Sequence, residues 1–167
     1  LEAAIEHFVT TGFADGLETN TFNAINYLAT NTSLINEYKD NLEAAIEHFV
    51  TTGFADGLEA NTFNAINYLA SNVDILGLFG ANVDLATVHY VNNGFNEGRN
   101  TNTFNAIRYL ASNTSLINDY KDNLEAAIEH YVTTGFDDGL ETNTFNAIRY
   151  LASNIDILGV FGANVDL

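Results

Sequence analysis

The chain of 167 residues lacks cysteine, proline, methionine and tryptophan, and it has only 5 basic residues against 22 acidic ones. Without cysteine there is no disulfide, no thiolate nucleophile and no cysteine zinc site. A formal net charge of −17 disfavours nucleic acid binding through phosphate neutralisation and repels an anionic lipid surface. No apolar run reaches the ~18 residues that cross a bilayer, so we expect no membrane insertion.

What the chain does contain is apolar and aromatic. Apolar residues make up 47% of it, including 12 Phe and 8 Tyr, so we expect a buried core rather than disorder. The sequence begins at Leu1 without an initiator methionine or a signal peptide. This start predicts an internal piece of a longer protein.

The chain repeats itself every 41 residues. This period divides it into repeat 1 (1–41), repeat 2 (42–82), repeat 3 (83–123), repeat 4 (124–164) and the start of a further unit (165–167). A second rhythm of 82 residues overlies the first. It alternates a polar variant (Thr32–Asp40, Thr114–Asp122) with an apolar variant (Val73–Ala81, Ile155–Ala163).

Each repeat predicts three short helices. The first covers about Leu1–Thr11, because its apolar residues recur at i, i+3, i+4, i+7 and i+8, and Gly12 is expected to end it in a left-handed conformation. The second covers Thr21–Thr30 and is capped by Asn20 or Thr21. The third covers Ser33–Lys39 in the polar variant and Asp74–Phe79 in the apolar one.

A single repeat has an apolar stripe but no opposing layer, so it cannot close a core by itself. Stacked neighbours would bury these stripes continuously. We therefore expect an all-α fold, an α-solenoid-like array of four 41-residue repeats with about three short helices each.

One histidine recurs per repeat, at the flank of the first helix's polar face. A metal site lacks a constant partner, because Glu6 is replaced by Val88 beside His89. We expect each histidine to bond a neighbouring repeat's backbone or an aromatic ring, with a pH-sensing ladder as the alternative. The four positions are His7, His48, His89 and His130.

The turn after the first helix is rich in oxygen ligands of the kind that calcium prefers. Its order of residues differs from the EF-hand loop, and Asp-Gly turns with Asn caps explain the same residues without an ion. Both interpretations stay open. The calcium candidates are Asp15, Glu18, Asn20, Asp56, Glu59, Asn61, Glu97, Asp138 and Glu141.

Nothing in the sequence predicts catalysis. The serines are interpreted as caps at helix starts, no Ser–His–Asp set recurs, and no glycine-rich phosphate loop is present. We expect a protein that is not an enzyme and has no other cofactor.

The recurring aromatic residues are expected to form the core. The apolar variant has lost the polar face of its third helix, and this predicts either a more deeply buried helix or a regularly spaced adhesive patch. The interface candidates are Ile75, Leu76, Leu78, Phe79, Ile157, Leu158, Val160 and Phe161.

Repeat 3 carries a family resemblance. His89–Arg99 followed by Thr103–Asn113 resembles the HYxxxGxxEGR…FDAxxYLAS tandem repeats of large secreted bacterial RTX-type and surface-layer-like proteins. Asp74–Asn82 is similar to another stretch of those repeats. Two departures weaken a cation site carried over from them: Asn105 stands where the pattern has Asp, and Leu17 where it has Arg. The resemblance implies an extracellular or cell-surface location and no enzymatic activity.

These patterns favour a structural protein. We expect copies to stack head to tail through uncapped repeats into an extracellular fibre, a surface layer or an adhesin stalk. The partner would be the chain itself, end to end and possibly side by side. The alternative is a solenoid module that recognises a peptide or glycan without self-assembly, and a cytoplasmic scaffold is a third option.

Overall fold

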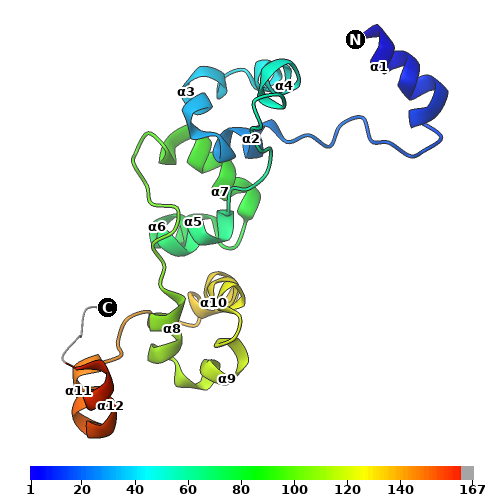
Figure 1. Ribbon diagram of the computed structural model, residues 1–167. Coiled ribbons are helices and arrows are strands. Elements are labelled where there is room, and N and C mark those ends of the chain that lie inside the picture. Colours follow the sequence, from blue (N-terminus) through cyan, green and yellow to red (C-terminus); the bar gives the residue numbers. More distant parts are fainter. Residues whose placement is uncertain (163–167) are drawn as a thin grey trace. The chain divides into compact units, whose positions relative to one another are not determined.

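A computed structural model describes residues 1–162 of the chain (Figure 1). Over that range the protein is all-helical and contains no strand, which confirms the predicted fold class. No helix within it combines the length and the apolar character that a bilayer crossing requires.

The first helix of each repeat is an α-helix that widens into a π-helical turn. The four pairs are α1 (Glu2–His7) with η1 (Phe8–Gly12), α4 (Leu42–His48) with η3 (Phe49–Gly53), α7 (Val83–His89) with η4 (Tyr90–Gly94), and α10 (Leu124–His130) with η6 (Tyr131–Gly135). A threonine hydroxyl bonds a carbonyl four residues earlier, as Thr51 does to Glu47 at 2.8 Å. Side-chain bonds of this kind satisfy helix carbonyls, and π-turns often mark functional positions.

The expectation for Gly12 was wrong. The chain passes through Gly12 in a right-handed conformation, since the residue after it, Phe13, still has φ −63° and ψ −43°. The left-handed residue is Gly16, with φ 70°, at the end of the following turn. Glycine at position 12 therefore needs a reason other than backbone conformation.

The second helices are shorter than predicted. They are α2 (Ala24–Thr30), α5 (Ala65–Ser71), α8 (Ala106–Ser112) and α11 (Ala147–Ser153). The cap of α2 is Asn23, whose side chain accepts a hydrogen bond from the amide of Asn26 at 3.0 Å. Asn20 and Thr21 lie in the preceding non-helical segment. An Asn in extended conformation satisfies a free amide of the first turn better than an earlier Thr does.

The third helices follow the 82-residue alternation. In the polar variant a 3₁₀ turn leads into a one-turn helix: η2 (Thr32–Leu34) with α3 (Ile35–Tyr38), and η5 (Thr114–Leu116) with α9 (Ile117–Tyr120). In the apolar variant the helix is continuous, as α6 (Val73–Phe79) and α12 (Ile155–Phe161). Isolated helices of this length are unstable, so packing must hold them.

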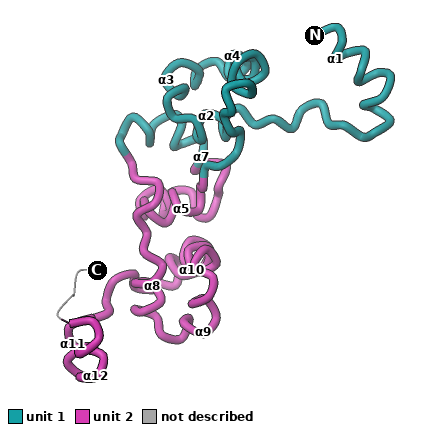
Figure 2. The backbone as a smooth tube through the Cα atoms, viewed as in Figure 1, with its two compact units in different colours: residues 1–63, 87–98 teal, residues 64–86, 99–167 magenta. Residues whose placement is uncertain are grey.

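The chain forms two compact units, coloured in Figure 2. Unit 1 comprises Leu1–Phe63 with Thr87–Gly98, and unit 2 comprises Asn64–Ala86 with Arg99–Leu167. Each unit contains helices from more than one repeat, so the folded groups do not coincide with the sequence repeats.

The core is formed across repeat boundaries. In unit 1, α2 of repeat 1 packs against α4 of repeat 2, and Tyr27, Leu28, Ile35 and Ala45 are fully buried there. In unit 2, α8 packs against α10 in the same way. The second and third helices of one repeat thus form a group with the first helix of the next repeat.

A further layer comes from the repeat after that. In unit 1, α2 also contacts η4 of repeat 3, and in unit 2, α5 contacts α10 and η6 of repeat 4. Each second helix therefore receives first helices from the next repeat and from the one beyond it.

Candidate assembly site

The contact between successive repeats is built on aromatic rings. The ring of Phe22 stacks on Phe49 at 4.8 Å between centroids, and in unit 2 Phe104 stacks on Tyr131 at 4.6 Å. Tyr27 and Tyr109 meet the same rings edge to face. Offset or edge-to-face aromatic pairs add about 0.5–1.5 kcal/mol beyond the area that they bury.

A hydrogen bond lies at the centre of this contact. The hydroxyl of Tyr27 is 2.8 Å from Nδ1 of His48, and that of Tyr109 is 2.7 Å from Nδ1 of His130. Burial raises the pKa of the Tyr109 phenol to about 12. The phenol therefore stays protonated at neutral pH and can donate to the imidazole. An aromatic ring is thus a hydrogen-bond partner of these histidines.

The same hydroxyl explains the recurring glycine. A Cβ atom added at Gly53 would overlap the hydroxyl oxygen of Tyr27, and one at Gly135 would overlap that of Tyr109. Only glycine leaves room for this approach. We call the set of contacts the aromatic joint: a Phe and a Tyr on a second helix, with a His, an aromatic residue and a Gly on the first helix of the next repeat.

Polar side chains fix the loop that follows each joint. The amide of Asn31 donates to the carbonyl of Tyr27 at 2.8 Å and to that of Glu59 at 2.7 Å. The hydroxyl of Thr30 accepts from the amides of Thr62 and Phe63. The same bonds recur in unit 2: Asn113 reaches Glu141, and Ser71 accepts from Thr103. Every connecting loop described this way is tied to the second helix before it.

This role corrects the interpretation of the serines. Ser71, Ser112 and Ser153 are the last residues of their helices, not the first. Ser71 and Ser112 accept hydrogen bonds from backbone amides of the next repeat's loop.

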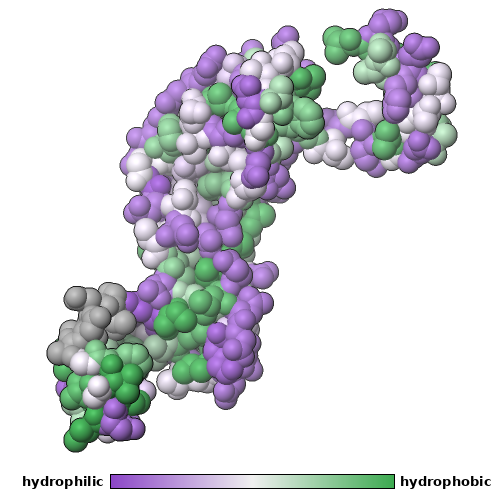
Figure 3. All heavy atoms as spheres, in the orientation of Figure 1, coloured by the Kyte–Doolittle hydropathy of each residue, from purple (hydrophilic) through white to green (hydrophobic). Residues whose placement is uncertain are grey.

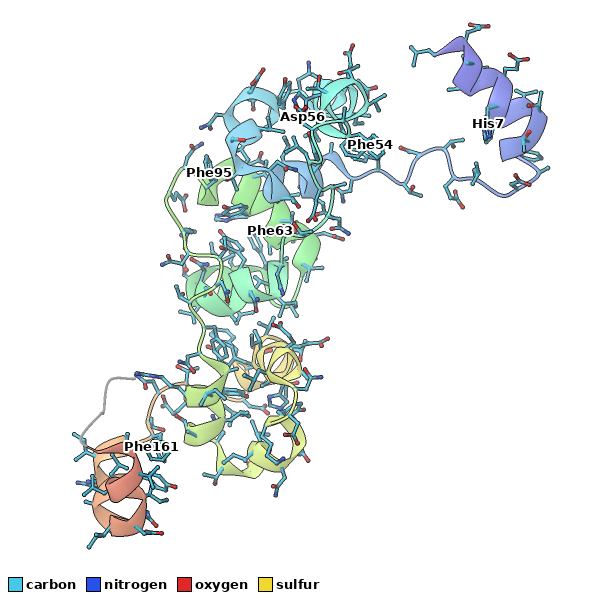
Figure 4. The ribbon with its side chains drawn as sticks, viewed as in Figure 1. His7, Phe54, Asp56, Phe63, Phe95 and Phe161 are labelled. Carbon is cyan, nitrogen blue, oxygen red and sulfur yellow. The ribbon has the colours of Figure 1, made fainter. Side chains whose placement is uncertain are left out.

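Two incomplete joints lie at opposite ends of the sequence. Near Leu1, the imidazole of His7 (labelled in Figure 4) forms no hydrogen bond within residues 1–162, and Phe8 contacts only Phe13 among the described rings. A Cβ at Gly12 would find only ordinary contacts of 3.4 Å or more. The His, Phe and Gly half of a joint is therefore present without its Tyr.

The other half lies on α11. Tyr150 is 44% exposed, whereas its equivalents Tyr27 and Tyr109 are fully buried. Phe145 contacts only Tyr150 among the rings of residues 1–162, and it lacks the stacked partner that Phe104 has. These residues have the chemistry that the first half lacks.

The interface candidates divide between core and surface. In α6, Ile75 and Leu76 are buried, Phe79 is half-buried and Leu78 is exposed. In α12, Leu158, Val160 and Phe161 are all exposed and Ile157 is half-buried. Hydrophobic residues gather over this part of the chain in Figure 3. Part of the apolar variant is thus core in one repeat and surface in the other.

The calcium candidates lie on exposed turns. Within residues 1–162 no three acidic or histidine side chains come together as a metal-binding group. The structure places Asp15, Glu18, Asn20, Asp56, Glu59, Asn61, Glu97, Asp138 and Glu141 on the surface. Glu59 and Glu141 contribute their backbone carbonyls to the loop bonds above, and the glycine after each acidic residue has positive φ. Turn geometry accounts for the pattern.

One ion pair distinguishes repeat 3. In unit 2 the guanidinium of Arg99 binds the carboxylate of Asp74 through two contacts, Nη1–Oδ1 at 3.0 Å and Nη2–Oδ2 at 2.9 Å. This hydrogen bond to Arg99 holds the pKa of Asp74 below its ordinary value. It ties the turn of repeat 3 to the apolar third helix of repeat 2.

A shallow polar groove of about 460 Å³ lies in unit 2, beside the guanidinium of Arg108. Ser71, Phe104 and Asn143 are among its lining residues, and Arg108 donates to Asn143 at 3.0 Å. The groove has no group of catalytic residues.

In comparisons with known proteins, no family model, no curated protein and no solved structure matches the chain. The argument for function therefore depends on the geometry of the joints.

Proposed function

We propose that the chain is a non-enzymatic structural protein whose copies stack end to end through the aromatic joint. The observation that carries this proposal is the pair of incomplete joints. Residues 1–22 supply the first-helix half, and α11 with α12 supply the second-helix half, so a second copy completes both.

The two halves match at the level of sequence. Residues 1–13 are identical to residues 42–54, which occupy a joint with α2. Residues 144–153 are identical to residues 103–112, which hold α10. Phe161 stands in place of Tyr120, whose ring lies 5.1 Å from that of His130. We expect His7 of one copy to bond Tyr150 and contact Phe161 of another.

The contact between copies would extend over two repeats. Inside unit 2, the ring of Phe136 lies against Gly77 of α6, so that a Cβ there would be 3.6 Å from it. The equivalents are Phe54, which is exposed and labelled in Figure 4, and Gly159, which has open space around it. We expect Phe54 of the arriving copy to pack on Gly159.

Such stacking has a direction, because the two faces differ. A heterologous contact between unlike faces continues into a filament unless it closes into a ring. Together with the resemblance to repeats of secreted bacterial proteins and the absence of cysteine, this favours an extracellular fibre, surface layer or adhesin stalk.

The first test is assembly of the purified chain. Sedimentation across a concentration series and negative-stain microscopy should show end-to-end oligomers. Gly12→Ala should weaken association about 100-fold, because the new Cβ would meet the Tyr150 hydroxyl of the other copy and overpacking costs about 3 kcal/mol. Folding should be unchanged, since the site is open in one copy.

A second substitution checks the geometry. Tyr150→Phe removes the hydroxyl, so the double variant with Gly12→Ala should recover part of the association. Dispersed monomers of the unaltered chain at every concentration would overturn the proposal. In that case the groove beside Arg108 would favour the binding-module alternative.

A further inference from the structure

The ion pair between Arg99 and Asp74 follows a rule in the sequence. Aspartate occurs at the second position of both apolar third helices, as Asp74 and Asp156, whereas the polar helices have Ser33 and Ser115 there. The turn position of Arg99 is leucine in the repeats that follow a polar helix, as Leu58 and Leu140. Within the chain, arginine therefore follows the acidic third helix and leucine follows the serine-containing one.

The pair has a geometry that a mobile surface contact lacks. Two parallel contacts join the planar guanidinium to both carboxylate oxygens, which fixes the direction of approach. Arg99 also reaches Oδ1 of Asn72, the residue that ties the loop of repeat 3 by donating to the carbonyl of Asn100. The ion pair and the loop bond thus select the same turn.

Asp156 of α12 is the second copy of this acidic position. It is exposed and forms no ion pair within residues 1–162. Asn154, which corresponds to Asn72, donates to the carbonyl of Tyr150 at 2.7 Å. In the interior repeats the same amide makes a second bond to the next loop, as Asn72 does to Asn100.

We infer that Asp156 is a specificity-determining residue of the end-to-end contact, a receptor for a cationic side chain at the turn position of the arriving copy. This inference rests on the proposed function. The occupant is the segment of residues 1–22 of a second copy, which presents Leu17 where Arg99 stands in repeat 3. The contact between copies therefore forms without the ion pair and is weaker than the one inside unit 2.

The test is a gain of affinity. Leu17→Arg should tighten association of the chain about three- to fivefold at low salt, the range of a well-oriented exposed ion pair. Asp156→Asn should remove that gain in the Leu17→Arg background and change association little in the unaltered chain. High salt should reduce the gain.

Two controls separate a specific pair from general charge reduction. Ala14→Arg adds the same charge to the same exposed turn, and Leu17→Gln adds length without charge; neither should tighten association. An unaltered chain that associates, with a Leu17→Arg gain that is absent or persists in Asp156→Asn, overturns the inference and leaves the proposed function standing. Failure of both the unaltered chain and Leu17→Arg to associate overturns both.

Discussion

Two regions of the chain have nearly the same sequence and different surroundings. Residues 42–53 and 124–135 differ only at Phe49, which is Tyr131 in the later repeat. Val50 is 66% exposed, whereas Val132 is 5% exposed. The buried alanines Ala45 and Ala127 are alike in both.

The difference comes from the number of neighbours. In unit 2, α10 and η6 are covered by α8 of the preceding repeat and by α5 of the repeat before that. In unit 1, α4 packs against α2 of the preceding repeat, and the second helix two repeats earlier would precede Leu1. A first helix of this sequence is thus complete only when two second helices cover it. The same residues serve as core or as surface according to their neighbours.

The largest effect should appear at the glycine of the complete joint. Gly135→Ala places a Cβ against the Tyr109 hydroxyl, and it should lower the free energy of unfolding by about 3 kcal/mol. Gly12→Ala has no such neighbour within one copy and should change stability by less than about 1 kcal/mol. Chemical denaturation of monomeric protein at low concentration measures both, and equal losses would contradict the comparison.

The valines give the next effect. Val132→Ala removes two buried methyl groups and should cost about 2 kcal/mol, because a buried methylene contributes about 0.8 kcal/mol and a cavity adds to it. Val50→Ala should stay within about 0.5 kcal/mol, as is usual for exposed positions. Thermal unfolding compares them directly. A large loss from Val50→Ala in the monomer would mean that another element covers α4.

The smallest effect is the alkaline pH dependence. The Tyr109 phenol has a pKa of about 12 in the folded protein and about 10 when unfolded, so the folded state holds its proton more tightly. Its contribution is fully present below pH 10 and is lost as pH rises towards 12, at about 1.4 kcal/mol per pH unit.

Substitution at the two joints should separate them. Tyr109→Phe should flatten the alkaline slope more than Tyr27→Phe, whose pKa is also raised by burial but in the less covered region. Denaturation between pH 9 and 12 measures the slopes. Identical slopes for both variants would show that the second covering helix adds nothing to the burial of the phenol.

Local patterns in the sequence predicted much of the fold. The 41-residue period, three helices per repeat and caps such as Asn41 are all visible in it, because they depend on residues within one turn of each other. The 82-residue alternation also predicted that α6 differs from α3, as it does in length and continuity.

The joint was not predictable in the same way. Tyr27 and Gly53 lie 26 residues apart, in different repeats, and periodicity assigns a residue to a face without naming the helix opposite. One signal was available: a buried tyrosine needs a hydrogen-bond partner, and a glycine inside a helical segment needs a close neighbour. The two requirements recur together in every repeat, and considering them jointly would have suggested the contact.

The offset between repeat and folded group also bears on how such an array changes in length. Because each joint links residues one repeat apart, deleting or duplicating any 82 consecutive residues rejoins a second helix to a first helix of the kind it already holds. The point of breakage is immaterial, since a cut within a loop or within a helix restores the same sequence on both sides. Genetic gain or loss of paired repeats would lengthen or shorten the protein without requiring a new interface.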